Sequence, residues 1–306
     1  MRLLILCALL FCGSVFSQNF PAKPVRIIVP FPPGGGADAL ARLMAPKLAG
    51  IWKQQPIVEN KPGASGHIGA DLVAQSPADG HTLLMSSTAS LTERNVHQFA
   101  PVTLVSASPY VVVLNSRIKI NDVAELISYA KASPGTLTFA SSGTGAASHL
   151  CAELFKSMAR VDLLHVPYKG VGQAVTDLLA GQVDLLFAPS QAVIQHVRAG
   201  KLKALAVTGA RRSATLPDLP TIGETVPGYV AVGWFGLLAP AATPRPLILQ
   251  LNRDLVSALE DKDLRKKASD LGADVVGNTP EEFARFIRDD QAKWAKLMRE
   301  AGIKPE

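Results

Sequence analysis

A regular alternation of strand and helix patterns constrains this chain more than any other feature. From residue 25 to residue 207, short runs of β-branched and aliphatic residues alternate with stretches whose apolar residues recur every three or four positions. Gly181 and Gly200 stand where two of these helices are expected to end. Because strands that alternate with helices pair mainly in parallel, with helices on both faces, the pattern predicts an α/β protein. The expected strands are 25–30, 82–85, 137–140, 163–166, 183–187 and 202–207, and the expected helices are 37–48, 124–132, 146–158, 171–180 and 191–199.

The last helix has the strongest local signals. Thr279 and Glu282 are spaced as a capping box, and Pro280 lies in the first turn, where proline is tolerated. Apolar residues then recur every three or four positions from Phe283 to Met298. We interpret this stripe as part of the core.

Two stretches are too long for ordinary strands of about five or six residues. They are residues 102–114, with Pro109 in the middle, and residues 230–240. A strand that bends at a proline or glycine and enters a second sheet would carry the chain between two lobes. Two such crossings divide the chain into lobe 1, residues 18–109 plus 230–306, and lobe 2, residues 110–229. A long edge strand with a bulge explains each stretch equally well.

The first 17 residues have the pattern of a secretory signal peptide. A basic Arg2 precedes an apolar run over residues 3–12, and small residues lie near Ser17. The apolar run is shorter than the ~20 residues that a membrane-spanning helix needs. The sequence therefore predicts an exported protein that is cleaved after residue 17.

Composition excludes several other classes of protein. A hydrophobic fraction of 48% with 18% charged residues excludes a disordered chain. The net charge of +6 is spread along the chain, so no nucleic-acid partner is expected. Of Cys7, Cys12 and Cys151, only Cys151 would remain after cleavage, and no disulfide could form within the mature chain.

Two matching units of strand, glycine-rich loop and helix carry the most functional information. The first loop, residues 31–38, contains three consecutive glycines, and the second, residues 141–146, contains Gly143 and Gly145. Glycine lets the backbone turn tightly and approach a ligand, and the following helix directs free N–H groups and its positive dipole end at the loop. Two such ends facing each other across a cleft could hold a carboxylate without Lys or Arg. Ordinary tight turns between strand and helix are an equally good explanation.

Other chemistries have weaker support. Gly143 and Gly145 resemble part of a dinucleotide-binding loop, but Asp162 precedes the next strand instead of following it, as a ribose-binding acid would. The six histidines show no metal-ligand spacing, and the Gly-x-Ser-x-Gly motif of hydrolases is absent from the sequence. We therefore expect no cofactor, no metal and no catalytic activity.

Three further positions have alternative interpretations. Asp38 in a first helical turn could stabilise the helix, orient the glycine loop or pair with a ligand amine. His149 is expected to brace its loop as a hydrogen-bond donor rather than to act as a base. Residues 168–170 form a third loop at the carboxyl end of a strand, where open α/β sheets place ligands, and Lys169 there could attract anions or lie in solvent.

An ordered set of short motifs resembles the Bug family, the solute-binding receptors of tripartite tricarboxylate transporters. The likeness extends over residues 20–304. The motifs are Pro30-Phe31-Pro32-Pro33-Gly34-Gly35, Glu59-Asn60-Lys61-Pro62-Gly63-Ala64, Phe99-Ala100-Pro101-Val102, Ser141-Ser142-Gly143 with His149-Leu150, His165-Val166-Pro167-Tyr168-Lys169-Gly170, Leu216-Pro217-Asp218, and Trp234 with Ala239-Pro240.

The resemblance implies a two-lobed α/β periplasmic binding protein of type II. Each lobe would be a mixed, mostly parallel sheet flanked by helices, with a cleft between the lobes and two crossing strands. It also implies a periplasmic monomer that binds a small carboxylate through loop backbone groups and water, with membrane permease subunits as partners. The implied ligand-binding residues are Phe31, Pro33, Gly34, Gly35, Gly36, Asp38, Ser141, Ser142, Gly143, Thr144, Gly145, His149, Tyr168, Lys169 and Gly170.

The sequence departs from the family pattern in two places. The segment 86–98 is shorter than in the family, so residues 86–90 are not counted as ligand contacts. Ala188 stands where the family commonly has aspartate, which is expected to alter the distal end of the pocket. Three alternative functions remain: an exported enzyme that acts on a small carboxylic acid through His149 or Lys169, a ligand-sensing co-receptor, and a scaffold without a ligand.

Overall fold

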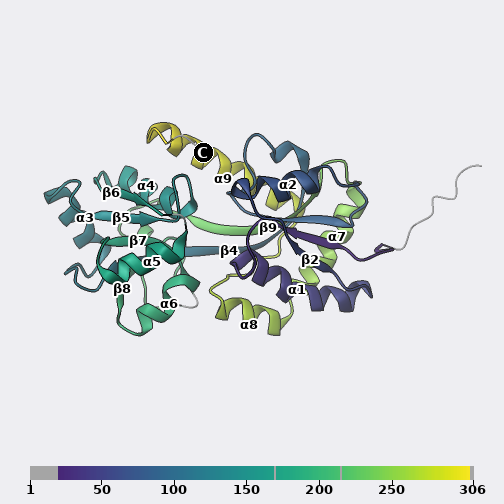
Figure 1. Cartoon of the computed structure of the whole chain (residues 1–306), viewed down its shortest axis with the longest axis horizontal. Coiled ribbons are helices and arrows are strands. Elements are labelled where there is room, and N and C mark those ends of the chain that lie inside the picture. Colours follow the sequence, from purple (N-terminus) through teal and green to yellow (C-terminus); the bar gives the residue numbers. More distant parts are fainter. Residues whose placement is uncertain (1–19, 169, 214–215, 304–306) are drawn as a thin grey trace, which may run out of the picture.

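The computed structural model describes residues 20–168, 170–213 and 216–303. The expected signal peptide and Lys169 therefore lie outside the described residues. The molecule is elongated and consists of two lobes joined in the middle (Figure 1). The expected α/β fold with two lobes and a mixed sheet is confirmed, because parallel strands alternate with helices in each lobe.

Lobe 1 is built on a sheet in the order β2-β1-β3-β9-β4. Its outer strands pair in parallel, whereas β9 pairs antiparallel with both of its neighbours. Its strands are β1 (Arg26–Val29), β2 (Ile57–Asn60), β3 (Thr82–Ser86), β9 (Val232–Pro240) and the first part of β4 (Phe99–Asn115). Its helices are α1 (Gly36–Trp52), α2 (His67–Ala74), α7 (Arg245–Leu259) and α8 (Lys262–Asp270), with short 3-10 turns η1 (Ala64–Gly66) and η2 (Val96–Gln98).

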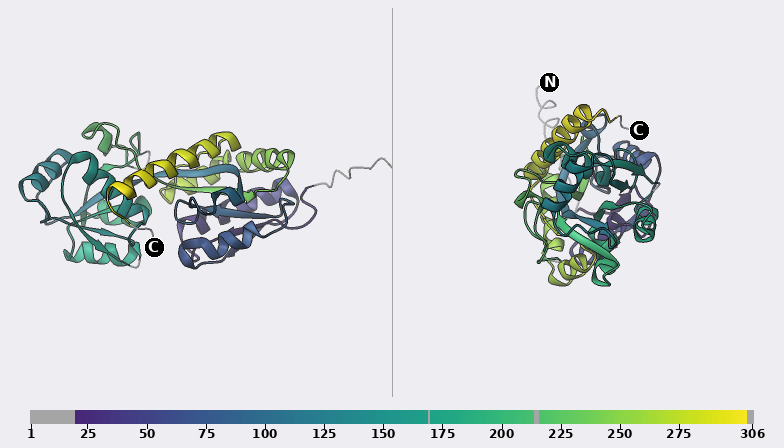
Figure 2. Two further views of the ribbon diagram at one scale, coloured as in Figure 1. Left: turned by 90° about the horizontal axis from the view of Figure 1, so that it is seen from above. Right: turned by 90° about the vertical axis from the view of Figure 1, so that its left-hand side faces the viewer.

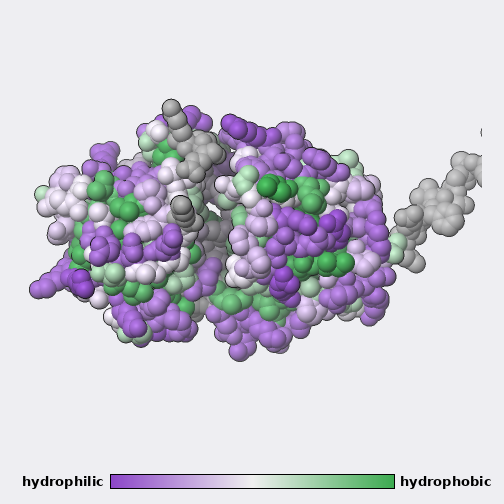
Figure 3. Space-filling model, in the orientation of Figure 1, coloured by the Kyte–Doolittle hydropathy of each residue, from purple (hydrophilic) through white to green (hydrophobic). Residues whose placement is uncertain are grey.

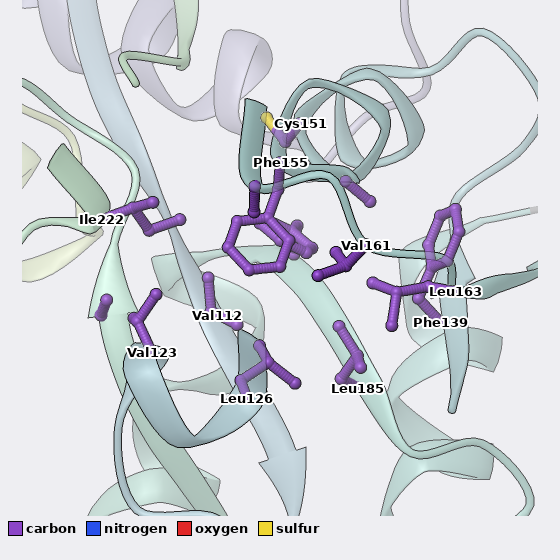
Figure 4. Close-up of a cluster of buried hydrophobic side chains, with 14 of the residues drawn as sticks. Val112, Val123, Leu126, Phe139, Cys151, Phe155, Val161, Leu163, Leu185 and Ile222 are labelled. Carbon is purple, nitrogen blue, oxygen red and sulfur yellow. The ribbon is translucent and has the colours of Figure 1, made fainter. Parts of the chain in front are cut away.

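Lobe 2 contains the last part of β4, which lies between β7 and β8, with β5 and β6 beyond β7. Its aliphatic and aromatic side chains form a separate core between the sheet and the helices (Figure 4). Its further strands are β5 (Thr138–Ser141), β6 (Leu164–Pro167), β7 (Leu185–Pro189) and β8 (Leu202–Val207). Its helices are α3 (Val123–Ala132), α4 (Ala147–Ala159), α5 (Val171–Ala180) and α6 (Ser190–Arg198), with the 3-10 turn η3 (Ile222–Glu224).

The strand β4 runs through both lobes over 17 residues. Up to Pro109 it pairs with β9, and from Tyr110 onward it pairs with β7 and β8. Just before β9, the N–H of Ala231 donates to the carbonyl oxygen of Thr208 in lobe 2 at 2.8 Å. Two extended segments therefore carry the chain between the lobes, as expected. The edge-strand alternative is wrong for β4, because β4 has strand neighbours on both sides in lobe 2.

The last helix, α9 (Pro280–Glu300), packs on both lobes (Figure 2). Its capping box between Thr279 and Glu282 is confirmed. Phe283 is buried in a lobe 1 cluster, whereas Trp294 and Leu297 are buried in the lobe 2 core. The segment 230–306 thus does not belong to lobe 1 throughout, and for the other residues we retain the expected division of the chain as a proposal.

In the part of the chain that the structure describes, no helix combines the length and the apolar character needed to cross a membrane.

Candidate functional site

A cavity of about 330 Å³ lies where the two lobes meet. The space-filling view shows a furrow between the lobes (Figure 3). Four regions of lobe 1, two regions of lobe 2 and the crossing strand β4 line the cavity. The lining residues are Gly34, Gly35, Gly36, Ala39, Leu40, Ser87, Thr88, Ala89, Ser108, Pro109, Tyr110, Ser142, Gly145, Ala146, Ala147, Pro189, Gln191, Gly233, Trp234, Phe235, Leu271, Gly272 and Ala273.

The first glycine-rich loop brings the N-terminus of α1 to this cavity. Gly35 is the N-cap residue, and no side chain caps the helix. The first N–H groups of α1 therefore remain available to an anion, and the helix dipole favours negative charge at this end. Gly34 has a φ of +85°, a conformation that glycine adopts without strain.

Asp38 holds the first glycine-rich loop in place through hydrogen bonds. Its buried carboxylate accepts hydrogen bonds from the Gly34 N–H and from Arg42 Nε, both at 3.0 Å. Burial favours the neutral acid, but the hydrogen bonds from Arg42 and Gly34 outweigh it and hold the pKa of Asp38 below its usual value. Arg42 also donates to the side chain of Asn60, which in turn donates to the carbonyl oxygen of Phe31. Of the three interpretations of Asp38, the contacts favour orientation of the glycine loop.

The second loop brings the N-terminus of α4 to the same cavity from lobe 2. Ala146 is its N-cap residue, and again no side chain caps the helix. The loop is held from within, because the N–H of Ser142 donates to Ser148 Oγ at 2.9 Å and the N–H of Gly145 donates to His149 Nδ1 at 3.0 Å. Two uncapped helix N-termini from different lobes thus open onto one cavity.

His149 belongs to a buried stack behind the second loop. Its ring is stacked on that of His165, with centroids 3.9 Å apart, and the ring of Phe139 lies nearly parallel to both, with its centroid 4.8 Å from that of His165 and 6.0 Å from that of His149. Burial, with a smaller effect of Lys156, lowers the pKa of His149 to about 4, and burial does the same for His165. His149 is therefore neutral at neutral pH, as its role as acceptor for the Gly145 N–H requires. It braces the loop as expected, but the expectation that it donates the hydrogen bond is wrong, because its Nδ1 accepts.

The expected binding residues divide into two groups. Five of them line the cavity: Gly34, Gly35, Gly36, Ser142 and Gly145. Nine are described but are not among the lining residues: Phe31, Pro33, Asp38, Ser141, Gly143, Thr144, His149, Tyr168 and Gly170.

The side chains of two residues in the second group contact other side chains of lobe 2. Ser141 Oγ lies 2.7 Å from His165 Nε2, and the Tyr168 phenol donates to Asp177 at 2.8 Å. Both side chains therefore support the loops from behind.

The sequence did not predict most of the residues that line the cavity. The long stretches 102–114 and 230–240 signalled crossings, but not that the crossings supply Tyr110, Trp234 and Phe235 to the cavity. Residues 87–89, which were not counted as contacts, also line it, whereas Ala188 is buried behind the wall. No pattern in the sequence indicated that the segment 271–273 after α8 lines the cavity.

The cavity has a mostly apolar lining, and its described residues include no charged side chain. None of its described lining residues is Asp, Glu, Lys, Arg or His. Within the described residues, no group of three or more His, Cys, Asp or Glu is placed to hold a metal ion. The electrostatic features of the site are therefore its hydroxyl and amide groups and the two helix N-termini.

The buried histidine stack predicts a pH-dependent stability. Between the unfolded pKa of about 6.5 and the folded value of about 4, the unfolded chain binds protons that the folded protein does not. The free energy of unfolding should therefore fall as the pH is lowered from about 6.5 to about 4, with this contribution fully present above that window. Urea unfolding at a series of pH values measures it. We expect His149→Gln to reduce the fall and the exposed His97→Gln to leave it unchanged, and an equal fall in all three proteins would contradict this assignment.

Comparison with known proteins places the chain in a family. The family model described as "Tripartite tricarboxylate transporter family receptor" matches residues 40–303. BugT of Bordetella pertussis is 38% identical over 304 residues, which cover 95% of this chain and 93% of BugT.

Two solved structures have the same fold. Rpa4515 of R. palustris, determined with adipate, is 34% identical with a TM-score of 0.80 and covers 94% of this chain and 100% of its own. The periplasmic binding protein BugD is 35% identical with a TM-score of 0.77, at 94% and 100% coverage. The expected Bug-like, two-lobed type II fold is thus confirmed, and the chain belongs to the receptor family of tripartite tricarboxylate transporters.

Proposed function

We propose that this protein captures a small organic acid between its lobes and delivers it to the membrane permease subunits of a tripartite transporter. One observation carries the proposal: the uncapped N-termini of α1 and α4 open from different lobes onto one cavity whose described lining is uncharged. Free N–H groups and aligned dipoles stabilise an anion at such ends. The structure of the relative Rpa4515 with adipate supports a carboxylate as the ligand.

We assign direct contact with the carboxylate to the lining residues of the two glycine-rich loops. These are Gly34, Gly35 and Gly36 in lobe 1 and Ser142 and Gly145 in lobe 2. Asp38 and His149 are positioning residues, because they bond to the backbone of these loops. In this proposal the protein is a monomeric receptor without catalytic activity, and His149 is occupied as a hydrogen-bond acceptor.

We also propose that the protein works in the periplasm after cleavage of residues 1–17. The relative BugD is a periplasmic binding protein, and the first residues have the pattern of a signal peptide. Mass spectrometry of the protein recovered from a periplasmic fraction tests this directly. The expected mass corresponds to a chain that begins at Gln18, and recovery of the uncleaved chain in the cytoplasm would contradict the proposal.

The ligand class can be tested by thermal unfolding of the mature protein after refolding without ligand. We expect one class among mono-, di- and tricarboxylates to raise the melting temperature, because a ligand at 100 times its Kd stabilises the native state by ~2.7 kcal/mol. Primary amides with the same carbon skeletons are the matched control, since they keep the shape and lack the charge. Equal stabilisation by acids and amides, or none by any acid, would refute a carboxylate receptor.

A pair of glycine substitutions tests the second loop. Gly145 and Gly200 have φ values of +77° and +68°, and no atom lies within 4 Å of a side-chain Cβ at either position. Gly145→Val and Gly200→Val should therefore carry similar strain, of about 1–2 kcal/mol. Only Gly145 lines the cavity, so we expect only Gly145→Val to weaken acid binding, by at least about tenfold, because its side chain would hold the acid away from the N-terminus of α4 and from the charge-assisted hydrogen bonds there.

Calorimetric titration, with urea unfolding as the check on folding, measures both effects. Wild-type affinity in Gly145→Val would remove the second loop from the site.

A further inference from the structure

Two polar side chains in the cavity lack partners within the protein. The other hydroxyl groups of the lining already make hydrogen bonds: Ser87 with Ala89, Thr88 with Asp290, Ser108 with Asp274 and Ser142 with Ser148. The Tyr110 phenol and the Gln191 side-chain amide, by contrast, make no hydrogen bond to any residue that the structure describes. Tyr110 is half-buried and Gln191 is exposed at the cleft, so both groups are free to form hydrogen bonds with a ligand or water that occupies it.

Gln191 reaches across the cleft from lobe 2. It lies in the first turn of α6, and its Nε2 is 3.5 Å from the point where a Cβ on Gly36 would stand. Its Oε1 is 3.6 Å from the corresponding point on Gly272, and both glycines belong to lobe 1 and line the cavity. The amide is thus placed to contact whatever the two lobes enclose.

Tyr110 forms part of the cavity wall at the point where β4 passes from one sheet to the other. Its phenol oxygen lies 3.4 Å from where a Cβ on Gly233 would stand, so the missing side chain there leaves room for the ring. Burial raises the pKa of this phenol, with a smaller effect of Cys151. Tyr110 therefore keeps its proton at neutral pH and offers a hydrogen-bond donor.

The absence of charged side chains from the described lining restricts the ligand further. An ammonium group buried without an anionic partner is costly, and the described lining contains no carboxylate. The helix N-termini that face the cavity are positive ends and would repel a cation. The Tyr110 phenol and the Gln191 amide can donate hydrogen bonds and have no carboxylate beside them in the described lining. They therefore favour a ligand group whose oxygen atom accepts a hydrogen bond.

We propose that Tyr110 and Gln191 determine ligand specificity by donating hydrogen bonds to a second oxygen-bearing group of the bound acid. That group is a hydroxyl, a carbonyl or a second carboxylate, and acids that carry an ammonium group are rejected. This inference rests on the proposed function, because it takes the first carboxylate to be held by α1 and α4.

Two matched series of acids test the inference by calorimetric titration. They are butanoate, 4-hydroxybutanoate, succinate and 4-aminobutanoate, and the six-carbon equivalents hexanoate, 6-hydroxyhexanoate, adipate and 6-aminohexanoate. In at least one series, we expect the hydroxy acid to bind about 3- to 10-fold more tightly than the unsubstituted acid, as one neutral hydrogen bond allows, and the diacid to bind at least as tightly as the hydroxy acid, because a hydrogen bond to a carboxylate is stronger. The amino acid should bind at least about tenfold more weakly than the unsubstituted acid.

Tyr110→Phe removes the phenol and keeps the ring. This variant should lose the advantage of the hydroxy acid and the diacid over the unsubstituted acid. Tyr129→Phe, at a tyrosine of α3 that is 47% exposed, is the matched control and should behave as wild type. An equal loss for every acid, or no loss for any, would overturn the role of Tyr110.

Gln191→Glu tests the effect of a negative charge in the cavity. Glutamate is favourable in a first helical turn, so the variant should fold, and it places a carboxylate in the cavity. We expect it to weaken binding of the diacid and to strengthen binding of the amino acid. Unchanged affinities would overturn the role of Gln191.

The outcomes separate the two proposals. If acids bind but the wild type prefers the amino acid or does not distinguish the four members, the specificity assignment fails and the carboxylate receptor stands. If no acid in these series or in the wider carboxylate panel binds, both proposals fail.

Discussion

The pairing of β4 with β9 is the interaction on which the rest of the structure depends. It holds the two lobes together along the crossing, and the same residues form a wall of the cavity. Small residues make this double role possible. A side chain on Gly233 would meet the ring of Tyr110, and one on Gly236 would overlap the ring of Phe283. The crossing therefore accepts an aromatic side chain from β4 at one glycine and one from α9 at the other.

The helix α9 fixes the wall from the outside through Asp290. This buried carboxylate accepts hydrogen bonds from Trp234 Nε1 at 2.9 Å and from Thr88 Oγ1 at 3.2 Å, and it pairs with Lys293 at 3.2 Å. A buried charge is tolerated when it is paired and hydrogen-bonded in this way. Because Thr88 and Trp234 both line the cavity, one residue of a helix that spans both lobes sets the position of two parts of its wall.

The sequence predicts the parts of this structure that local patterns control. The alternating strands and helices from β3 to β8, the capping box at Thr279 and the two strand crossings follow from periodicity and from proline and glycine positions, whereas β2, α2, α7 and α8 were not predicted. The walls depend on the register between distant strands, and β4 shifts register against β9 near Pro101 and Leu104. These shifts change which side chains face the cleft, so the position of Tyr110 could not be read from alternation. The roles of Ser141 and Tyr168 were missed for a related reason, since their partners, His165 and Asp177, come from other elements.

Holding an anion by helix N-termini from both lobes has a consequence for closure. A single arginine in one lobe could hold a carboxylate while the lobes stayed apart, because its charge and paired donors act alone. In the proposed site the α1 and α4 N-termini each supply only part of the stabilisation, and they come from different lobes. The ligand is then bound fully only when the lobes enclose it, so it binds the closed arrangement more tightly than an open one. That difference in affinity is what allows a ligand to shift a receptor toward its closed state. In the proposed receptor, the absence of charge from the described lining thus links recognition of the acid to closure of the cleft.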